Sequence, residues 1–391
     1  MGMRANEGVD RAFVVDLLKD LIAANSVNPT VGRGPGESAV ADLIYDRFTS
    51  IGGLEVRRQQ VGDGRSNVIA ILKGSGGGRS LMLNGHMDTV GVDGMIIEPF
   101  KPFIENGRLH GRGACDMKGA LAGMIGALKS LVDSGSELRG DLMLAAVVDE
   151  EYKSIGTKKL VEEYRADAAI VGEPTEMKTA IAHKGFVWIE VEIKGKAAHG
   201  SVPEKGVDAI AHAAKVVSGL ERLQKRLATR THPLLGSPKV HTSTIQGGTD
   251  WSIIPERCVL RLERRTLPGE PVSSVMNEID EILQDIKKNN RDLEATARSP
   301  YDMPPLETAP TELIVQLLQQ ALAKVAGREM PITGVPYWTD GALLSKLASI
   351  PTCLFGPGDI GVAHSADEHV SVKDVLDSTY VYRTIAQTFC S

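Results

Sequence analysis

In the stretch from Leu81 to Val90, a short apolar run is followed by His86 and Asp88. Histidine and aspartate are residue types that bind metal ions and transfer protons. The run reads as a buried strand, and the two-residue side-chain period of a strand places His86 and Asp88 on the same face. A metal-bound imidazole needs an acceptor for its second ring nitrogen, which a nearby carboxylate can supply. A single His-x-Asp pair fits a buried structural histidine equally well, so other residues must decide between the two interpretations.

Three further segments carry carboxylates in a loop or directly after a predicted strand, which are positions comparable to those of His86 and Asp88. They are Asp116 in the glycine-rich loop 111–119, the run Asp149-Glu150-Glu151 after the apolar strand 141–148, and Glu173 after the short strand 168–171. Taken alone, Asp116 could be a helix N-cap. Successive acids at the end of a buried strand, however, repel one another unless a cation or a proton lies between them. Because α/β sheets carry their sites at the carboxyl ends of strands, these residues predict one shared site.

The elements that must position these residues alternate between strands and helices. Apolar periodicity predicts helices over 10–24, 120–131, 311–326 and 372–389, another through Tyr45 and Phe48, and strands over 54–61, 67–72 and 351–355. Residues 183–299 follow another order: strand 187–193, helix 208–227, strands 241–246 and 257–265, helix 273–288, strand 291–298. That order predicts a self-contained antiparallel sheet with helices on one face.

Length and composition agree with two domains. A chain of 391 residues is too long for one ordinary core, and 42% hydrophobic with 24% charged residues describes a globular protein. No apolar run has the length of a membrane span and no secretory signal pattern is visible, so we expect a cytoplasmic protein. Four scattered cysteines predict neither a disulfide framework nor a thiolate zinc site. A net charge of −6 without a basic block argues against nucleic acid and membrane partners.

Several motifs carry a resemblance to a known family. They are His86-Met87-Asp88, Gly111-Arg112-Gly113 through Asp116-Met117-Lys118-Gly119, Asp149-Glu150-Glu151, Gly172-Glu173-Pro174-Thr175 and the closing segment 361–368 with His364. In this order they resemble the M20 family of co-catalytic zinc amidohydrolases, the group of acetylornithine deacetylase, succinyl-diaminopimelate desuccinylase, aminoacylase-1 and glutamate carboxypeptidase. The resemblance runs from about Val9 to the C-terminus. Each motif alone is weak, and together they are strong.

The resemblance implies a fold and a cofactor. It implies an α/β catalytic domain of the zinc-peptidase type, with a twisted mixed sheet between helices, formed by residues 1–182 and 300–391. It assigns residues 183–299 to an inserted α+β lid that also carries the dimer interface. It further implies two zinc ions per subunit, with cobalt or manganese as alternatives. The implied metal ligands are His86, Asp116, Glu151, Glu173 and His364, with Asp116 bridging, His86 and Glu173 completing one ion, and Glu151 and His364 completing the other.

The same resemblance implies roles for residues that are not ligands. Glu150 corresponds to the general base, and Asp88 to the partner of His86. His199, in Ala197-Ala198-His199-Gly200-Ser201, matches a lid histidine that contacts the substrate carbonyl from the partner subunit of a homodimer. Arg265 matches the arginine that binds the substrate carboxylate, although Arg264 could be the residue on the site side.

One departure from the family pattern bears on the substrate. Ser252 stands where the family usually has Asn, so the position loses an amide donor and gains space. Thr339 is a further candidate substrate contact. Trp251 and Trp338 flank motif positions and could accompany a bulky substrate, but tryptophans more often belong to the core.

Three hypotheses about function follow. The leading one is a metal-dependent hydrolase that cleaves the amide bond of an N-acyl amino acid, or of a related small amide with a free carboxylate. The second is a dipeptidase or carboxypeptidase on the same scaffold, because a dipeptide also presents an amide beside a carboxylate. The third, a non-catalytic relative that binds metal or ligand, is disfavoured because Glu150 and all of the implied ligands are present.

Overall fold

The structure, a computed structural model, describes residues 8–62 and 64–391. The chain forms two compact units. The first comprises the described residues up to Ile181 together with Thr308–Thr333 and Thr339–Ser391, and the second comprises Ala182–Glu307 and Gly334–Trp338. Within the described ranges, no helix combines the length and apolar character of a membrane span.

The first unit holds most of the helices and most strands of the main sheet. Its elements are α1 (Arg11–Ala23), α2 (Ser38–Ile51), β1 (Glu55–Gly62), β2 (Arg65–Leu72), β3 (Leu81–His86), β4 (Phe103–Glu105), β5 (Arg108–His110), the helical turn η1 (Ala114–Lys118), α3 (Gly119–Asp133), β6 (Leu142–Val147), α4 (Ile155–Glu163), β7 (Ala168–Val171), α7 (Leu313–Ala326), α8 (Gly341–Ala348), β17 (Thr352–Leu354), β18 (His369–Ser371) and α9 (Val372–Phe389). The strands β8 (Thr179–His183) and β16 (Ile332–Val335) contain residues of both units.

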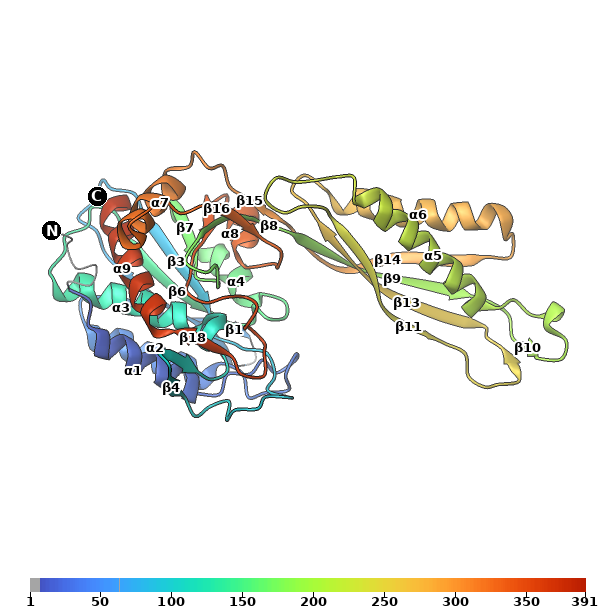
Figure 1. Ribbon diagram of the computed structural model, residues 1–391, viewed down its shortest axis with the longest axis horizontal. Helices are drawn as coiled ribbons and strands as arrows, with labels where there is room; N and C mark the ends of the chain where they lie inside the picture. Colours follow the sequence, from blue (N-terminus) through green and yellow to red (C-terminus); the bar gives the residue numbers. More distant parts are fainter. Residues whose placement is uncertain (1–7, 63) are drawn as a thin grey trace. The chain divides into compact units, whose positions relative to one another are not determined.

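The main sheet is mixed and lies between helices, which confirms the predicted fold class. Its strand order is β1-β2-β6-β3-β7-β17-β8-β15, with β16 paired to β8. The central strands β6, β3, β7 and β17 run parallel, and β2 and β8 flank them in antiparallel pairing. Figure 1 shows α3 and α9 on one side of these strands and α4 and α8 on the other. The parallel strands are continuous apolar runs because both of their faces are covered.

Two strand-end glycines allow close packing next to the predicted site residues. A Cβ atom on Gly85, just before His86, would lie 2.6 Å from Cε of Met117. A Cβ on Gly172, just before Glu173, would lie at the same distance from that methyl carbon. Glycine at both positions therefore lets the η1 turn approach the strand ends.

The second unit is an antiparallel sheet with helices on one face, as the sequence predicts. Its elements are β9 (Gly185–Lys194), β10 (Ala198–His199), the short turn η2 (Pro203–Lys205), α5 (Ala209–Leu227), β11 (Lys239–Gly247), β12 (Ile253–Ile254), β13 (Arg257–Thr266), α6 (Val272–Asn289), β14 (Glu294–Met303) and β15 (Leu306–Glu307). The sheet order is β11-β13-β9-β14, and α5 and α6 run along one of its faces (Figure 1). Inward side chains of both layers form one apolar core.

The last strand of this sheet is longer than the predicted segment 291–298. β14 continues through Pro300 to Met303 because its pairing with β9 shifts register between Arg298 and Tyr301. An edge strand tolerates proline, since one side of its backbone needs no ladder partner. The segment of the second unit that contains β14 extends to Glu307.

Candidate metal centre

The predicted ligands meet at one edge of the main sheet. His86 is the last residue of β3, Glu150 and Glu151 follow the end of β6, and Glu173 follows β7. These strands are parallel neighbours, so their carboxyl ends deliver the three segments to the same place. His364, from the loop before β18, and Asp116, from η1, complete the cluster through contacts with these residues.

Asp116 lies between two histidines. Its Oδ1 is 2.9 Å from Nε2 of His86, and its Oδ2 is 3.2 Å from Nε2 of His364. Each histidine also approaches a second carboxylate: His86 lies 3.9 Å from Oε1 of Glu173, and His364 lies 3.3 Å from Oε1 of Glu151. The cluster therefore consists of two imidazole-carboxylate pairs that share one aspartate. Asp116 is not the N-cap of α3, a position that Lys118 occupies.

The donor set fits divalent cations. Two groups of side chains place one ligand atom each within 4.8 Å of one another, namely His86 with Asp116 and Glu151, and His86 with Glu150 and Glu173. Oε1 of Glu173 is buried and has no hydrogen-bond partner among the described residues. A buried carboxylate oxygen without a donor is costly, and a cation would satisfy it. Mixed imidazole and carboxylate donors suit zinc and similar transition metals.

The charges of the cluster are strongly coupled. Burial, with a further effect of neighbouring carboxylates, raises the pKa of Glu150 and of Glu173 well above the usual range. Burial opposes protonation of His364, but its contacts with Asp116 and Glu151 outweigh burial and raise its pKa to about 10. Burial also acts to raise the pKa of Asp116, but its bonds to the two imidazoles hold that pKa well below normal. Bound cations would take the place of these protons.

Asp88 contacts His86 through its main chain and, at a longer distance, through its side chain. The acceptor for Nδ1 of His86 is the backbone carbonyl oxygen of Asp88, at 2.9 Å, and the nearer carboxylate oxygen lies 3.6 Å away. The carboxylate instead accepts the backbone N–H groups of Glu150, at 3.1 Å, and of Glu151, at 3.2 Å. The main chain of Asp88 thus orients the imidazole, and its side chain holds the segment that carries two other site residues.

A second non-ligand carboxylate holds the Asp116 loop. Glu368 is fully buried and accepts the backbone N–H groups of Gly113, Cys115 and Asp116 at 2.9 to 3.0 Å. Nη1 of Arg112 donates to it at 2.6 Å. Sequence reasoning placed both Glu368 and Arg112 inside motifs but gave them no role. The motif spacing was the available signal, but no local pattern shows which distant backbone a carboxylate will bind.

His199 and Ser252 lie together in the second unit. β10 pairs with β12, so His199 is opposite Ile253, and the backbone N–H of Gly200 donates to the carbonyl oxygen of Ser252 at 2.8 Å. His199 is exposed, and its Nδ1 lies 2.8 Å from the hydroxyl of Ser201. The two predicted substrate contacts therefore belong to one surface loop region.

The two neighbouring arginines have different surroundings. Arg264 is 1% exposed and bonds Glu278 at 3.1 Å and Glu270 at 3.0 Å, so its guanidinium is occupied inside the second unit. The side chain of Arg265 is 31% exposed and lies over the ring of Phe186. Of the two alternatives, Arg265 is the one available to a ligand.

The remaining predicted positions differ in exposure. Thr339 is buried in the first unit, and its hydroxyl accepts the N–H of Gly341 at the start of α8. Trp338 is partly buried and donates from Nε1 to the carbonyl oxygen of Pro304 at 2.9 Å. Trp251 is fully exposed, so the expectation that tryptophans belong to the core is wrong at that position.

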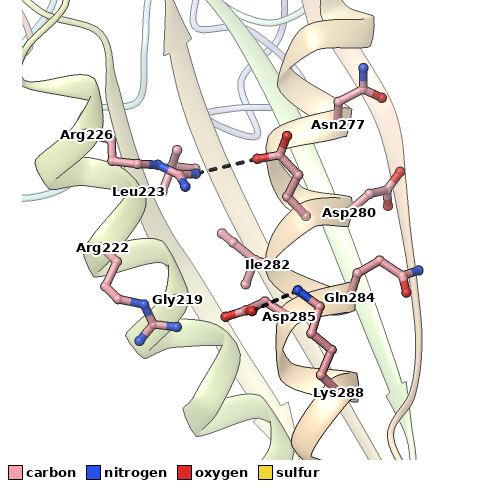
Figure 2. A pocket seen from close by; sticks show the side chains of 11 residues that line it. Gly219, Arg222, Leu223, Arg226, Asn277, Asp280, Ile282, Gln284, Asp285 and Lys288 are labelled. Atoms are coloured by element: carbon pink, nitrogen blue, oxygen red, sulfur yellow. Dashed lines mark hydrogen bonds and ion pairs between the residues drawn. The ribbon is translucent and has the colours of Figure 1, made fainter.

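A surface groove of about 590 Å³ lies between α5 and α6 of the second unit (Figure 2). Its walls carry both signs of charge: Arg226 lies 3.8 Å from Glu281, and Lys288 lies 3.4 Å from Asp285. None of the predicted site residues lines this groove.

Comparisons with known proteins add the family. The sequence profile of Peptidase family M20/M25/M40 matches residues 82–388. The chain is 32% identical to acetylornithine deacetylase of Myxococcus xanthus, over 86% of this chain and 89% of that protein. It is 30% identical to N-formyl-4-amino-5-aminomethyl-2-methylpyrimidine deformylase of Bacillus subtilis, over 97% of this chain and 95% of that protein. The crystal structure of aminopeptidase PepT from Bacillus cereus shares the fold, with a TM-score of 0.81 at 22% identity over 98% of this chain and 100% of that one.

Proposed function

Because the chain belongs to Peptidase family M20/M25/M40, we propose that it is a metal-dependent hydrolase of the amide bond in an N-acyl amino acid, or in a related small amide with a free carboxylate. The observation that carries the proposal is the placement of Asp116, whose two oxygens each face a different imidazole-carboxylate pair. This is the arrangement that two adjacent cations with one bridging carboxylate require.

The proposed cofactors are two zinc ions per subunit, with cobalt or manganese as alternatives. His86, Glu173 and Oδ1 of Asp116 would hold one ion, and His364, Glu151 and Oδ2 of Asp116 the other. Such a pair, when bound, polarises an amide carbonyl and makes a water nucleophilic near neutral pH.

Glu150 is the proposed general base. It directly precedes Glu151 in the chain, and one of its carboxylate oxygens lies within 4.8 Å of ligand atoms of His86 and Glu173. A carboxylate at this place can take a proton from the attacking water and pass it to the leaving amine. Asp88 assists by holding the backbone of Glu150 and Glu151.

The proposed substrate contacts lie mainly in the second unit. Arg265 would bind the substrate carboxylate, and among the described residues its guanidinium makes one hydrogen bond, from Nε to Oε1 of Glu263 at 2.7 Å. Both Nη groups are therefore left for a bidentate contact. His199 would donate to the carbonyl oxygen from the partner subunit, and Ser252 and Thr339 are further proposed contacts.

A homodimer formed through the second unit is part of the proposal. β11 and β14 are the two edge strands of its sheet. β14 contains Glu294, Arg298, Pro300 and Asp302, which discourage pairing with another strand, whereas residues 240–247 of β11 contain no charged residue and no proline. Isologous pairing along β11 is therefore favoured. We also place the protein in the cytoplasm, since all four cysteines are free and buried.

A dipeptidase or carboxypeptidase activity is the second candidate. A dipeptide presents the same amide beside the same carboxylate, so Arg265 and the metal centre would serve both substrate classes. The two candidates differ in the group on the carbonyl side of the cleaved bond, an acyl group or an aminoacyl group, which the residues of the centre do not specify.

A release assay tests these proposals. Amino acid release is measured across acetyl, succinyl, formyl and aminoacyl conjugates, with zinc, cobalt or manganese added to the metal-free protein. We expect the protein to release amino acid from an acyl conjugate, and to do so only when one of these metals has been added. Release from aminoacyl conjugates alone would select the second candidate, and no release with any metal would leave the non-catalytic hypothesis.

A further inference from the structure

Asn28 is a fully buried residue that the proposed function has not used. It follows α1, where Asn28-Pro29 ends the helical pattern. Its backbone N–H donates to the carbonyl oxygen of Thr89 at 2.8 Å. Its Oδ1 accepts the N–H groups of Thr30, at 2.9 Å, and of Val31, at 3.3 Å. Because its own turn occupies the oxygen, the side-chain amide is fixed with Nδ2 pointing away from that turn.

Nδ2 of Asn28 bridges two buried carboxylates. It lies 2.8 Å from Oδ2 of Asp88 and 3.0 Å from Oδ1 of Asp149. An amide nitrogen has two hydrogens, so each carboxylate receives one. Both aspartates are at most 2% exposed, and buried acceptors of this kind are costly without donors.

These two carboxylates hold the segment 149–151. Asp88 accepts the backbone N–H groups of Glu150 and Glu151 at 3.1 and 3.2 Å. Asp149 begins the segment in the left-handed region, with φ of 68°, which is an unfavourable conformation for a residue with a side chain. Oδ1 of Asp149 also meets Arg65 at 3.0 Å. The segment therefore depends on side-chain bonds, and Asn28 links its two anchors.

We propose that Asn28 is a positioning residue for the Glu150-Glu151 segment and thereby for the metal pair that contains Glu151 and His364. The inference rests on the proposed function for the roles of those residues. It predicts an asymmetric defect, because Oδ2 of Asp88, which Asn28 contacts, also accepts the backbone N–H of Glu151. His86 instead bonds the backbone carbonyl oxygen of Asp88, so its position depends less on the Asn28 amide. Displacement of a catalytic group by about 1 Å can cost on the order of a hundredfold in rate.

The experiment compares Asn28→Asp, Asn28→Ala and Asn28→Ser with the wild type. Asn28→Asp is nearly isosteric but removes both N–H donors. Asn28→Ala removes the whole amide, and Asn28→Ser can keep one donor, its hydroxyl. The matched control is Asn25→Asp, because Oδ1 of Asn25 accepts the N–H of Val27 at 3.0 Å and an aspartate can do the same. The readouts are binding of Co²⁺ to the metal-free protein in competition with a chelator, the visible spectrum of the bound Co²⁺, kcat and KM, and the thermal midpoint without metal.

We expect Asn28→Asp and Asn28→Ala to weaken one of the two Co²⁺ equivalents by about 10- to 100-fold and the other by clearly less, with an altered spectrum. kcat should fall by a similar factor with little change in KM, and Asn28→Ser should lie between these variants and the wild type. Wild-type Co²⁺ binding and spectra in the variants that fold would overturn the proposal, as would equal weakening of both equivalents. The Co²⁺ measurements decide the role of Asn28 even if the wild type hydrolyses none of the amides, so this failure is distinguishable from failure of the proposed function.

Discussion

Each carboxylate oxygen of Asp116 lies within 3.2 Å of a different histidine, and the two histidines are 278 residues apart along the chain, at His86 and His364. A metal site at the strand ends could be predicted from the residue types, because successive acids at the end of a buried strand repel one another unless a cation or a proton lies between them. The direction of each oxygen could not, because it depends on the backbone of η1 and on Glu368. For the same reason the sequence predicted that Asp88 is the partner of His86 but not that its carboxylate, 3.6 Å from Nδ1 of His86, also accepts the backbone N–H groups of Glu150 and Glu151.

At this scale we predict a selective effect of Arg265→Lys. Lysine keeps the charge but cannot offer a bidentate contact, so kcat/KM for substrates with a carboxylate should fall about tenfold or more. The corresponding uncharged amides should lose much less. Arg261→Lys is the control, since Arg261 lies on the same strand but is exposed and paired with Glu190. Equal losses on both substrate types would count against the role of Arg265.

At the scale of elements, the network around Arg264 joins β13 to α6. The sequence pattern predicted both elements from their periodicity. It did not predict that Arg264, Glu270 and Glu278 would meet below the surface, because such pairing depends on how strand and helix are packed. Burial acts to raise the pKa of Glu270, but the N–H of Leu267 and the charge of Arg264 outweigh burial and lower it.

The lowered pKa of Glu270 predicts a pH-dependent contribution to stability. Since the folded-state pKa lies below the ordinary value of 4.5, the contribution is fully present above that pH and is lost as the pH falls through the folded-state pKa. Glu270→Gln should therefore lower the free energy of unfolding by about 1 to 3 kcal/mol at pH 7, and by progressively less below pH 4.5.

Urea unfolding at a series of pH values provides the measurement. The control is Glu281→Gln, because Glu281 forms an exposed pair with Arg226 that should contribute about 0 to 1 kcal/mol. A difference between wild type and Glu270→Gln that stays constant down to pH 3.5 or lower, as far as both proteins remain folded, would refute the linkage.

At the scale of the whole molecule, the order of elements was readable from periodicity, and the long-range pairings were not. The three-stranded sheet β18-β5-β4 joins His369 to His110, two segments whose own patterns do not predict strands. β14 likewise continues past Pro300 because it lies at a sheet edge, a position that only the assembled sheet reveals. Local pattern thus predicts elements, whereas pairing between distant segments depends on the tertiary fold.

Subunit mixing tests whether the site is shared across a homodimer. Glu150→Ala and His199→Ala should each be nearly inactive, because each removes one group from every site. If His199 acts in trans, a mixed dimer has one complete site, and a statistical mixture should recover about a quarter of the wild-type activity. With subunit exchange verified independently, activity that stays at the level of the parent variants would mean that His199 acts within its own subunit or not at all.

In the proposed site, Asp116 binds two metal ions, whereas Glu150 lies among the ligands but transfers protons. These two roles can be separated by elemental analysis of the metal content, measured together with turnover in Glu150→Ala and Asp116→Ala. We expect Glu150→Ala to retain both ions and to lose turnover by about a hundredfold or more, and Asp116→Ala to lose metal as well as turnover. A Glu150→Ala protein that hydrolyses substrate at the wild-type rate, or that fails to retain its metal, would show that Glu150 is not the general base of this site.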